Sequence, residues 1–334
     1  MSESENESEV WASDFVGESD KNVAVACQGG GSHTAFTAGV LKGLLEDWSP
    51  EHRLVGLSGS SGGAFNAVAT WYGLASGDRT DAVENLVGIW DDLSADGLVD
   101  RMTNDMMVGY SRIEGSGFPT PSVSPYYVPG SALGQEKIKR ALGRYIEFDE
   151  IPNYCEGSFP ELVVGTVNVN AGEFETFKNG NVTPEAVLAS AADPSLFEGV
   201  EIHGHVHWDG LFSQNPPVND LMRVEPDRKP DEVWVVQINP QEREGEPKTL
   251  EEITDRRNEL SGNISLNQEL HFIERVNDWV DEGYLPEDDF TKTEVRRIEM
   301  GESYHCSTKL DRSPDFIDEL MELGEKRAGE FLAD

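Results

Sequence analysis

The sequence has few basic residues for its length, and this shortage excludes two classes of partner. Lysine and arginine number 26 against 63 aspartates and glutamates, which gives a net charge of −37 over 334 residues. Such a surface repels nucleic acids and anionic membranes, so we expect neither as a partner. The acidic residues are spread along the whole chain, which is typical of proteins that work where concentrated salt screens the repulsion. We therefore interpret the charge as an adaptation to a halophilic environment rather than as a binding site.

Cysteines and long apolar runs are also scarce. Cys27, Cys155 and Cys306 stand alone, with neither the paired spacing of a zinc site nor the density of a disulfide scaffold. No apolar run approaches the ~20 residues that span a bilayer, and no signal-peptide pattern is visible. We expect a cytoplasmic protein with no transmembrane segment, no metal and no cofactor.

Alternating strand-like and helical patterns predict an α/β fold with a parallel sheet. A β-branched run at 23–27 passes through the glycines of QGGGS into a helical pattern at 33–48. The same order of strand, glycines and helix returns at 53–74, and two such units in succession favour parallel strands. Residues 1–20 are acidic and serine-rich, which predicts a flexible leader, and 21–334 contain no linker long enough to divide a single domain.

A different composition marks residues 80–150, which we predict to be an insertion of helices and loops. Its middle, MMVGYSRIEGSGFPTPSVSPYYVPGS, is rich in Met, Tyr, Pro and Gly and is predicted to be an irregular loop packed on the surface, with a lid at 105–130 as the alternative. Further strands are predicted at 161–169, 201–208, 232–240 and 294–300, and further helices at 184–192, 250–283 and 314–333.

The stretch GSSGGAFNA predicts a nucleophilic serine. In a nucleophile elbow the serine sits on a sharp turn between strand and helix, so the residues two before and two after it must be small. Ser61 has Gly59 and Gly63 at those positions, whereas neither Ser58 nor Ser60 has both. Ser61 is therefore the predicted nucleophile, and a tight structural turn is the alternative.

Acyl transfer also needs donors for the developing oxyanion. Gly29, Gly30 and Gly31 lie between a predicted strand and a helix N-terminus, where bare backbone N–H groups can converge on a negative oxygen. A dinucleotide-binding loop is the alternative, but its third glycine would fall where this chain has Thr34. We predict that the three glycines form an oxyanion hole.

The general base is harder to assign, because no histidine stands out. His271 and His305 lie in polar or helical stretches without a distinguishing turn. His203, His205 and His207 alternate along one predicted strand; at ~3.3 Å per residue one ion cannot bind all three, although two of them with Asp209 could.

An aspartate is the remaining type of base. Asp96-Gly97 falls in a polar break, where this pair is common in turns. Asp209-Gly210 instead closes a predicted strand, and parallel sheets gather their active sites at the C-terminal ends of strands. We predict that Asp209 is the base.

Together these motifs resemble the patatin-like family of serine hydrolases. QGGGSHTAFTAGVL resembles the family's oxyanion loop, GSSGGAFNA its nucleophile motif, and WDGLFSQNPP its Asp-Gly motif with a following Asn-Pro. VLASAADPSLF is similar to the family's Ala-Ser helix. The resemblance implies a three-layer α/β/α fold around a mainly parallel sheet and a Ser61–Asp209 dyad. His33 and Thr34 depart from the basic residue and glycine that usually continue the oxyanion loop.

The resemblance also implies a substrate class. The INPQEREG segment and the tail around DRRNELSGN resemble a branch that contains intracellular polyhydroxyalkanoate depolymerases, and the halophilic composition is compatible with a host whose lipids are ether-linked. We predict a serine esterase that degrades a polyester storage granule, to which it could attach in the cytoplasm. The alternatives are a phospholipase A acting on lipid esters and a non-enzymatic granule-associated protein.

Overall fold

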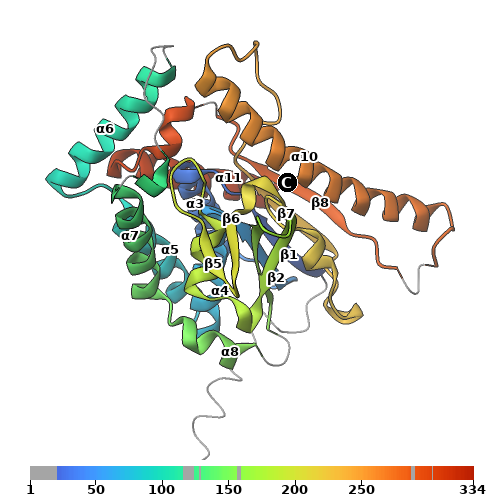
Figure 1. Ribbon diagram of the computed structural model, residues 1–334. Helices are drawn as coiled ribbons and strands as arrows, with labels where there is room; N and C mark the ends of the chain where they lie inside the picture. The colour runs from blue at the N-terminus through green and yellow to red at the C-terminus, as the bar shows by residue number, and fades with distance from the viewer. Residues whose placement is uncertain (1–20, 116–123, 128, 156–158, 287–289, 303) are drawn as a thin grey trace, which may run out of the picture.

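The computed structural model describes residues 21–115, 124–127, 129–155, 159–286, 290–302 and 304–334. A central sheet lies between two layers of helices (Figure 1). The strands are β1 Lys21–Cys27, β2 His52–Ser60, β3 Glu161–Asn168, β4 Glu173–Lys178, β5 Val200–Ile202, β6 His205–Asp209, β7 Glu232–Gln237 and β8 Glu294–Glu299. The α-helices are α3 Ala35–Glu46, α4 Gly62–Ser76, α5 Arg79–Leu93, α6 Leu98–Gly115, α7 Pro129–Tyr145, α8 Ile151–Tyr154, α9 Pro184–Ser190, α10 Leu250–Asp281 and α11 Pro314–Ala333.

The sheet is parallel in its centre and antiparallel at one side. Its order is β5-β6-β3-β2-β1-β7-β8, and β4 also pairs with β3. Strands β3, β2, β1, β7 and β8 run parallel, whereas β4 and β6 run antiparallel to β3. The parallel strands β1 and β2 therefore end at the same edge, where each passes into a turn and a helix.

Both faces of the sheet are buried, as the apolar composition of β1 requires. Side chains alternate along a strand, so Val23, Val25 and Cys27 contribute to the larger core, which α3, α4, α5 and α11 cover. Ala24 and Ala26 face the opposite side, where the smaller core includes Leu266, Leu270 and Ile273 of α10. The predicted α/β architecture with helices on both faces is confirmed (Figure 1).

Two predictions of local structure were wrong. Residues 106–115, predicted to be irregular, form the second half of helix α6. The strand predicted at 201–208 is a hairpin of β5 and β6, because His203 and Gly204 adopt positive φ angles of 51° and 80° and turn the chain back. The three alternating histidines therefore do not share one strand.

Other expectations concern segments that the structure describes in part or not at all. The predicted leader at 1–20 lies outside the described residues, as does the 116–123 part of the candidate lid. Strand β8 lies in the same sheet as β1, and helix α11 packs on the same core. The division of the chain into a leader at 1–20 and a single domain at 21–334 stays a prediction. Within the described ranges, no helix is both long and apolar enough to cross a membrane.

Candidate active site

Ser61 lies in the turn between β2 and α4 with a backbone conformation that L-residues rarely adopt. Its φ is 55° and its ψ is −132°, and it is one of the few described non-glycine residues with a positive φ. Ser58 and Ser60 are fully buried, and the Ser60 hydroxyl donates to the Gln214 carbonyl at 2.7 Å. Ser61 is partly exposed. Of the three serines, only Ser61 has the strained, accessible placement that a nucleophile needs.

The flanking glycines make this turn possible. A Cβ at Gly59 would lie 2.3 Å from the Gly63 carbonyl oxygen, and a Cβ at Gly63 would lie 2.2 Å from the Cys27 carbonyl oxygen. Such distances exclude any larger residue at either position. The sequence argument from small residues two before and two after Ser61 therefore has its physical basis in close contact with the backbone.

Ser190, at the end of α9, holds the turn from the other side. The Ser61 N–H donates to the Ser190 hydroxyl at 2.9 Å and to its carbonyl at 3.1 Å. The Ser190 hydroxyl donates in turn to the Gly165 carbonyl in β3 at 2.6 Å. Sequence reasoning assigned no role to Ser190, although the motif VLASAAD contains it.

Asp209, the last residue of β6, lies beside Ser61 from a distant part of the chain. The residue is 4% exposed, and its carboxyl accepts a hydrogen bond from the Leu211 N–H at 2.8 Å. Burial raises the pKa of Asp209 to about 8, while the Leu211 N–H and the neighbouring Ser61 side chain oppose the rise. The structure thus brings together the two residues that the sequence selected as nucleophile and base.

The glycine loop passes directly over Ser61. A Cβ at Gly29 would lie 2.7 Å from the Ser61 Cβ. The Gly29 N–H, however, donates to the Asn215 Oδ1 at 2.6 Å, so this amide is already paired. The Gly30 and Gly31 N–H groups have no partner among the described residues, and both glycines reach the surface. Of the three predicted oxyanion donors, Gly29, Gly30 and Gly31, only the last two therefore have an amide available.

Comparison with known proteins identifies this arrangement. A family model for patatin-like phospholipases matches residues 25–222, which is more than half of the chain and includes the glycine loop, Ser61 and Asp209. The chain belongs to the patatin-like phospholipase family. Its members are serine ester hydrolases, and the α/β fold with a mostly parallel sheet is the patatin-like fold.

Two solved structures are similar to this patatin-like chain at low identity. VipD from Legionella pneumophila is 14% identical with a TM-score of 0.47, over 94% of this chain and 67% of that one. The ExoU–SpcU complex from the type III secretion system of Pseudomonas aeruginosa is 14% identical with a TM-score of 0.38, over 94% of this chain and 51% of that one. A search of curated proteins gives no match.

The histidines considered as bases or metal ligands in this patatin-like chain are exposed or engaged elsewhere. His203, His205, His271 and His305 are exposed. His207 is buried, and its Nε2 lies 2.9 Å from a Glu175 carboxylate oxygen. In the part of the chain that the structure describes, no group of three His, Cys, Asp or Glu side chains could hold a metal ion. The two-histidine site with Asp209 has no support in this geometry.

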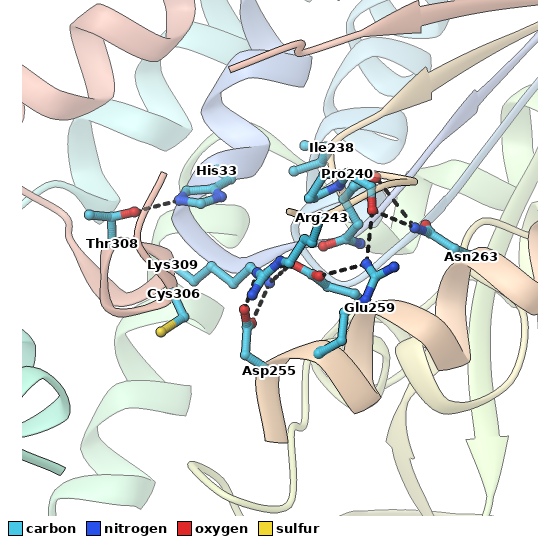
Figure 2. Close-up of polar contacts among 12 residues, drawn as sticks. His33, Ile238, Pro240, Arg243, Asp255, Glu259, Asn263, Cys306, Thr308 and Lys309 are labelled. Atoms are coloured by element: carbon cyan, nitrogen blue, oxygen red, sulfur yellow. Dashed lines mark hydrogen bonds and ion pairs between the residues drawn. The ribbon is translucent and has the colours of Figure 1, made fainter. Parts of the chain in front are cut away.

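His33, which stands where the family's oxyanion loop usually has a basic residue, is buried beside two aromatic side chains. Its ring packs against Tyr304 and Phe316, and its Nε2 lies 2.7 Å from the Thr308 hydroxyl (Figure 2). Burial lowers the pKa of His33 to about 3, so the ring is neutral at ordinary pH. His33 therefore anchors the loop by packing and adds no positive charge to it.

An ion-pair cluster lies behind the glycine loop. Glu259, on α10, is buried and pairs with Arg243 and Lys309, and Asp255 pairs with the same two residues (Figure 2). Glu259 also pairs with Arg256. The carbonyl oxygen of Lys309 would lie 2.4 Å from a Cβ at Gly31. The cluster thus fixes the 3₁₀-helix Cys306–Leu310 against the loop. Sequence reasoning missed it because its members come from three separate segments.

Proposed function

We propose that this chain hydrolyses carboxylic esters of lipids through a Ser61–Asp209 dyad. The observation that carries the proposal is the placement of a serine on a strained turn beside a buried carboxyl, close enough for the Ser61 side chain to lower the pKa of Asp209. Membership of the patatin-like phospholipase family supports the reaction class and favours a lipid acyl ester as substrate.

The proposed reaction has two half-reactions. Asp209 accepts the Ser61 proton as the Ser61 oxygen attacks the ester carbonyl, and the Gly30 and Gly31 N–H groups stabilise the oxyanion. The C–O bond to the alcohol then breaks, and Asp209 returns the proton to the leaving alkoxide. In the second half, Asp209 takes a proton from the water that attacks the acyl-enzyme carbonyl. The bond between the acyl carbon and the Ser61 oxygen then breaks, and Asp209 returns the proton to this oxygen, which releases the acid and regenerates the Ser61 hydroxyl.

The pKa of Asp209 predicts how activity depends on pH. A base acts only when deprotonated, so kcat/KM for a soluble ester should rise with pH and level off above about pH 8, where the pKa of this carboxyl lies. A histidine base would instead give half-maximal activity near its ordinary pKa of ~6.5. A pH profile of kcat/KM with p-nitrophenyl butyrate distinguishes the two, and a midpoint at the histidine value would contradict an aspartate base.

An exposed apolar stripe lies on a helix that contacts the support of the glycine loop. Leu98, Met102 and Met106 follow one another at intervals of four residues on α6 and are 78%, 61% and 73% exposed. The Arg112 Nε of the same helix donates to the Ser307 hydroxyl at 3.4 Å, so α6 packs on the 3₁₀-helix beside the glycine loop. Exposed apolar surface on a helix that packs against this support suits contact with a lipid or polymer surface.

A polyester storage granule is the second candidate substrate. The net charge of −37 disfavours binding to anionic phospholipid bilayers, whereas an uncharged polyester surface does not repel the protein. The INPQEREG segment and the tail around DRRNELSGN favour the same interpretation. On this proposal the enzyme works in the cytoplasm, attached to the granule.

Parallel assays at molar salt separate the candidates. We expect fatty acid release from zwitterionic phospholipid vesicles to exceed 3-hydroxy acid release from native polyhydroxyalkanoate granules, with Ser61→Ala as the blank for both. The reverse order would favour the polyester. Release of neither product, together with no turnover of a soluble ester, would favour a non-enzymatic granule-associated protein.

A further inference from the structure

Two asparagine side chains form hydrogen bonds with the backbone N–H and carbonyl of Gly29, the residue before Gly30. The Gly29 N–H donates to the Asn215 Oδ1 at 2.6 Å, and the Gly29 carbonyl accepts from the Asn215 Nδ2 at 3.3 Å and from the Asn239 Nδ2 at 3.1 Å. A backbone N–H can only donate and a carbonyl can only accept, so these contacts fix which amide atom of Asn215 faces which group. Both asparagines are at most 2% exposed.

These hydrogen bonds determine the direction of the Gly30 N–H group. In a trans peptide the carbonyl of one residue and the N–H of the following residue point to opposite sides of the chain. Since both asparagines hold the Gly29 carbonyl, the Gly30 N–H points away from them. No partner for it is found among the described residues.

Gln28 fixes the asparagines in turn. Its Oε1 accepts the N–H groups of Ile238 and Asn239 at 2.9 and 2.8 Å, and its Nε2 donates to the Asn263 Oδ1 at 2.9 Å. Asn263 donates onward to the Pro240 carbonyl at 3.1 Å (Figure 2). Gln28 is fully buried with both ends of its amide satisfied, so the support is rigid rather than adjustable.

We propose that Asn215 and Asn239 are positioning residues that aim the Gly30 N–H at the oxyanion formed on attack by Ser61. The inference rests on the proposed ester hydrolysis. It gives one shared role to the Asn-Pro that follows the Asp-Gly motif and to the Asn of the INP segment, because both act through the Gly29–Gly30 peptide without touching the substrate. Donors placed in advance stabilise charge that develops only in the transition state, so their loss lowers kcat more than it raises KM.

The test replaces each asparagine and compares it with a remote one that makes similar contacts. Asn215→Ala and Asn239→Ala should each lower kcat for p-nitrophenyl butyrate about 10- to 100-fold, since small misplacement at a reacting centre costs up to about 10²-fold, with KM changed less than about threefold. Asn277 is the control, because its amide accepts the Thr293 N–H at 3.0 Å and donates to the Thr293 carbonyl at 2.8 Å. Asn277→Ala should lower the melting temperature yet leave kcat close to that of the wild type.

Inhibition by a transition-state analogue distinguishes a positioning role from a purely structural one. A trifluoromethyl ketone forms an adduct with serine that carries the oxyanion, so its inhibition constant should rise in proportion to the fall in kcat/KM across the two variants. The inhibition constant of the matching alcohol, which forms no oxyanion, should stay unchanged.

The outcomes separate this inference from the proposed function. The positioning role is wrong if the wild type hydrolyses the ester and the folded Asn variants keep the wild-type kcat. It is also wrong if the variants lose affinity equally for the ketone and the alcohol. Neither result contradicts the proposed roles of Ser61 and Asp209. If the wild type is inactive, the proposed function itself fails. Should Asn215→Ala not fold, Asn239→Ala decides the question, since it removes only one of the two donors to the Gly29 carbonyl.

Discussion

Replacement of Ser61 by alanine is expected to lower kcat for a soluble ester by about 10⁴- to 10⁶-fold, the range typical of a lost serine nucleophile. The physical reason is that no acyl-enzyme forms without the Ser61 oxygen. The strained backbone at φ 55° remains, so the alanine variant should keep the wild-type fold, with a melting temperature within a few degrees. Steady-state kinetics and thermal unfolding at molar salt measure both effects.

Ser58→Ala is the matched control for this variant. Ser58 lies three residues earlier in the same segment, is fully buried, and its hydroxyl has no hydrogen-bond partner among the described residues. Removing an unpaired buried hydroxyl should leave kcat unchanged and the free energy of unfolding equal or slightly higher. Equal loss of activity in both variants would mean that the loss reflects disruption of the turn rather than removal of the nucleophile.

Replacement of Asp209 by asparagine is expected to have the second largest effect, a fall in kcat of about 10²- to 10⁴-fold. Asparagine can still accept the Leu211 N–H at the position of Oδ1, but it cannot take the Ser61 proton. The remaining activity should also lose the rise with pH that the wild type shows near pH 8. Wild-type kcat in Asp209→Asn would show that Asp209 is not the base.

The same variant should be more stable than the wild type at alkaline pH. The pKa of Asp209 is raised from 3.8 to about 8 in the folded chain, so the folded state holds its proton over a range in which the unfolded state has lost it. The stability of the wild type therefore falls between these two pKa values through this group, and the gap to Asp209→Asn widens over that window. Unfolding by denaturant at a series of pH values measures the gap, and a gap that stays constant would contradict the raised pKa.

Glu269→Gln is the matched control for the carboxyl. Glu269 is buried on α10, its carboxylate accepts the Val218 and Asn219 N–H groups at 2.7 Å each, and burial raises its pKa. It should show a pH-dependent gain in stability of the same sign with kcat unchanged. A parallel loss of kcat would indicate that any buried carboxyl beside the sheet affects activity indirectly.

The placement of Ser61 on a sharp turn and of Asp209 at a strand end could be predicted from sequence because the constraints on both positions are local. The glycines around Ser61 are required by close backbone contacts at the turn, and Asp209 ends a strand where a turn must follow. Such requirements can be recognised from neighbouring residues in a short stretch of sequence. The parallel strands β1 and β2 were predictable for the same reason, since each carries a buried apolar run followed by a glycine turn.

The supports of the site could not be predicted, because they depend on contacts across the chain. Ser190 reaches the turn from 129 residues away, and Asn215 and Asn239 reach the loop from 186 and 210 residues away. Nothing in their own neighbourhoods specifies which backbone group they meet. The hairpin at His203 was missed because a non-glycine residue takes a positive φ there. Helix α6 was missed because its exposed methionines and tyrosine resemble the composition of a loop.

The rate at which a fluorophosphonate labels Ser61 tests the central claim most directly. The reagent reacts with an activated serine, and peptide mass spectrometry locates the modified residue. We predict that the wild type is labelled at Ser61 with a rate that rises toward pH 8. Asp209→Asn should be labelled at a rate at least about 100-fold lower. Labelling at another residue, or equal rates in the two proteins, would contradict a nucleophile activated by Asp209.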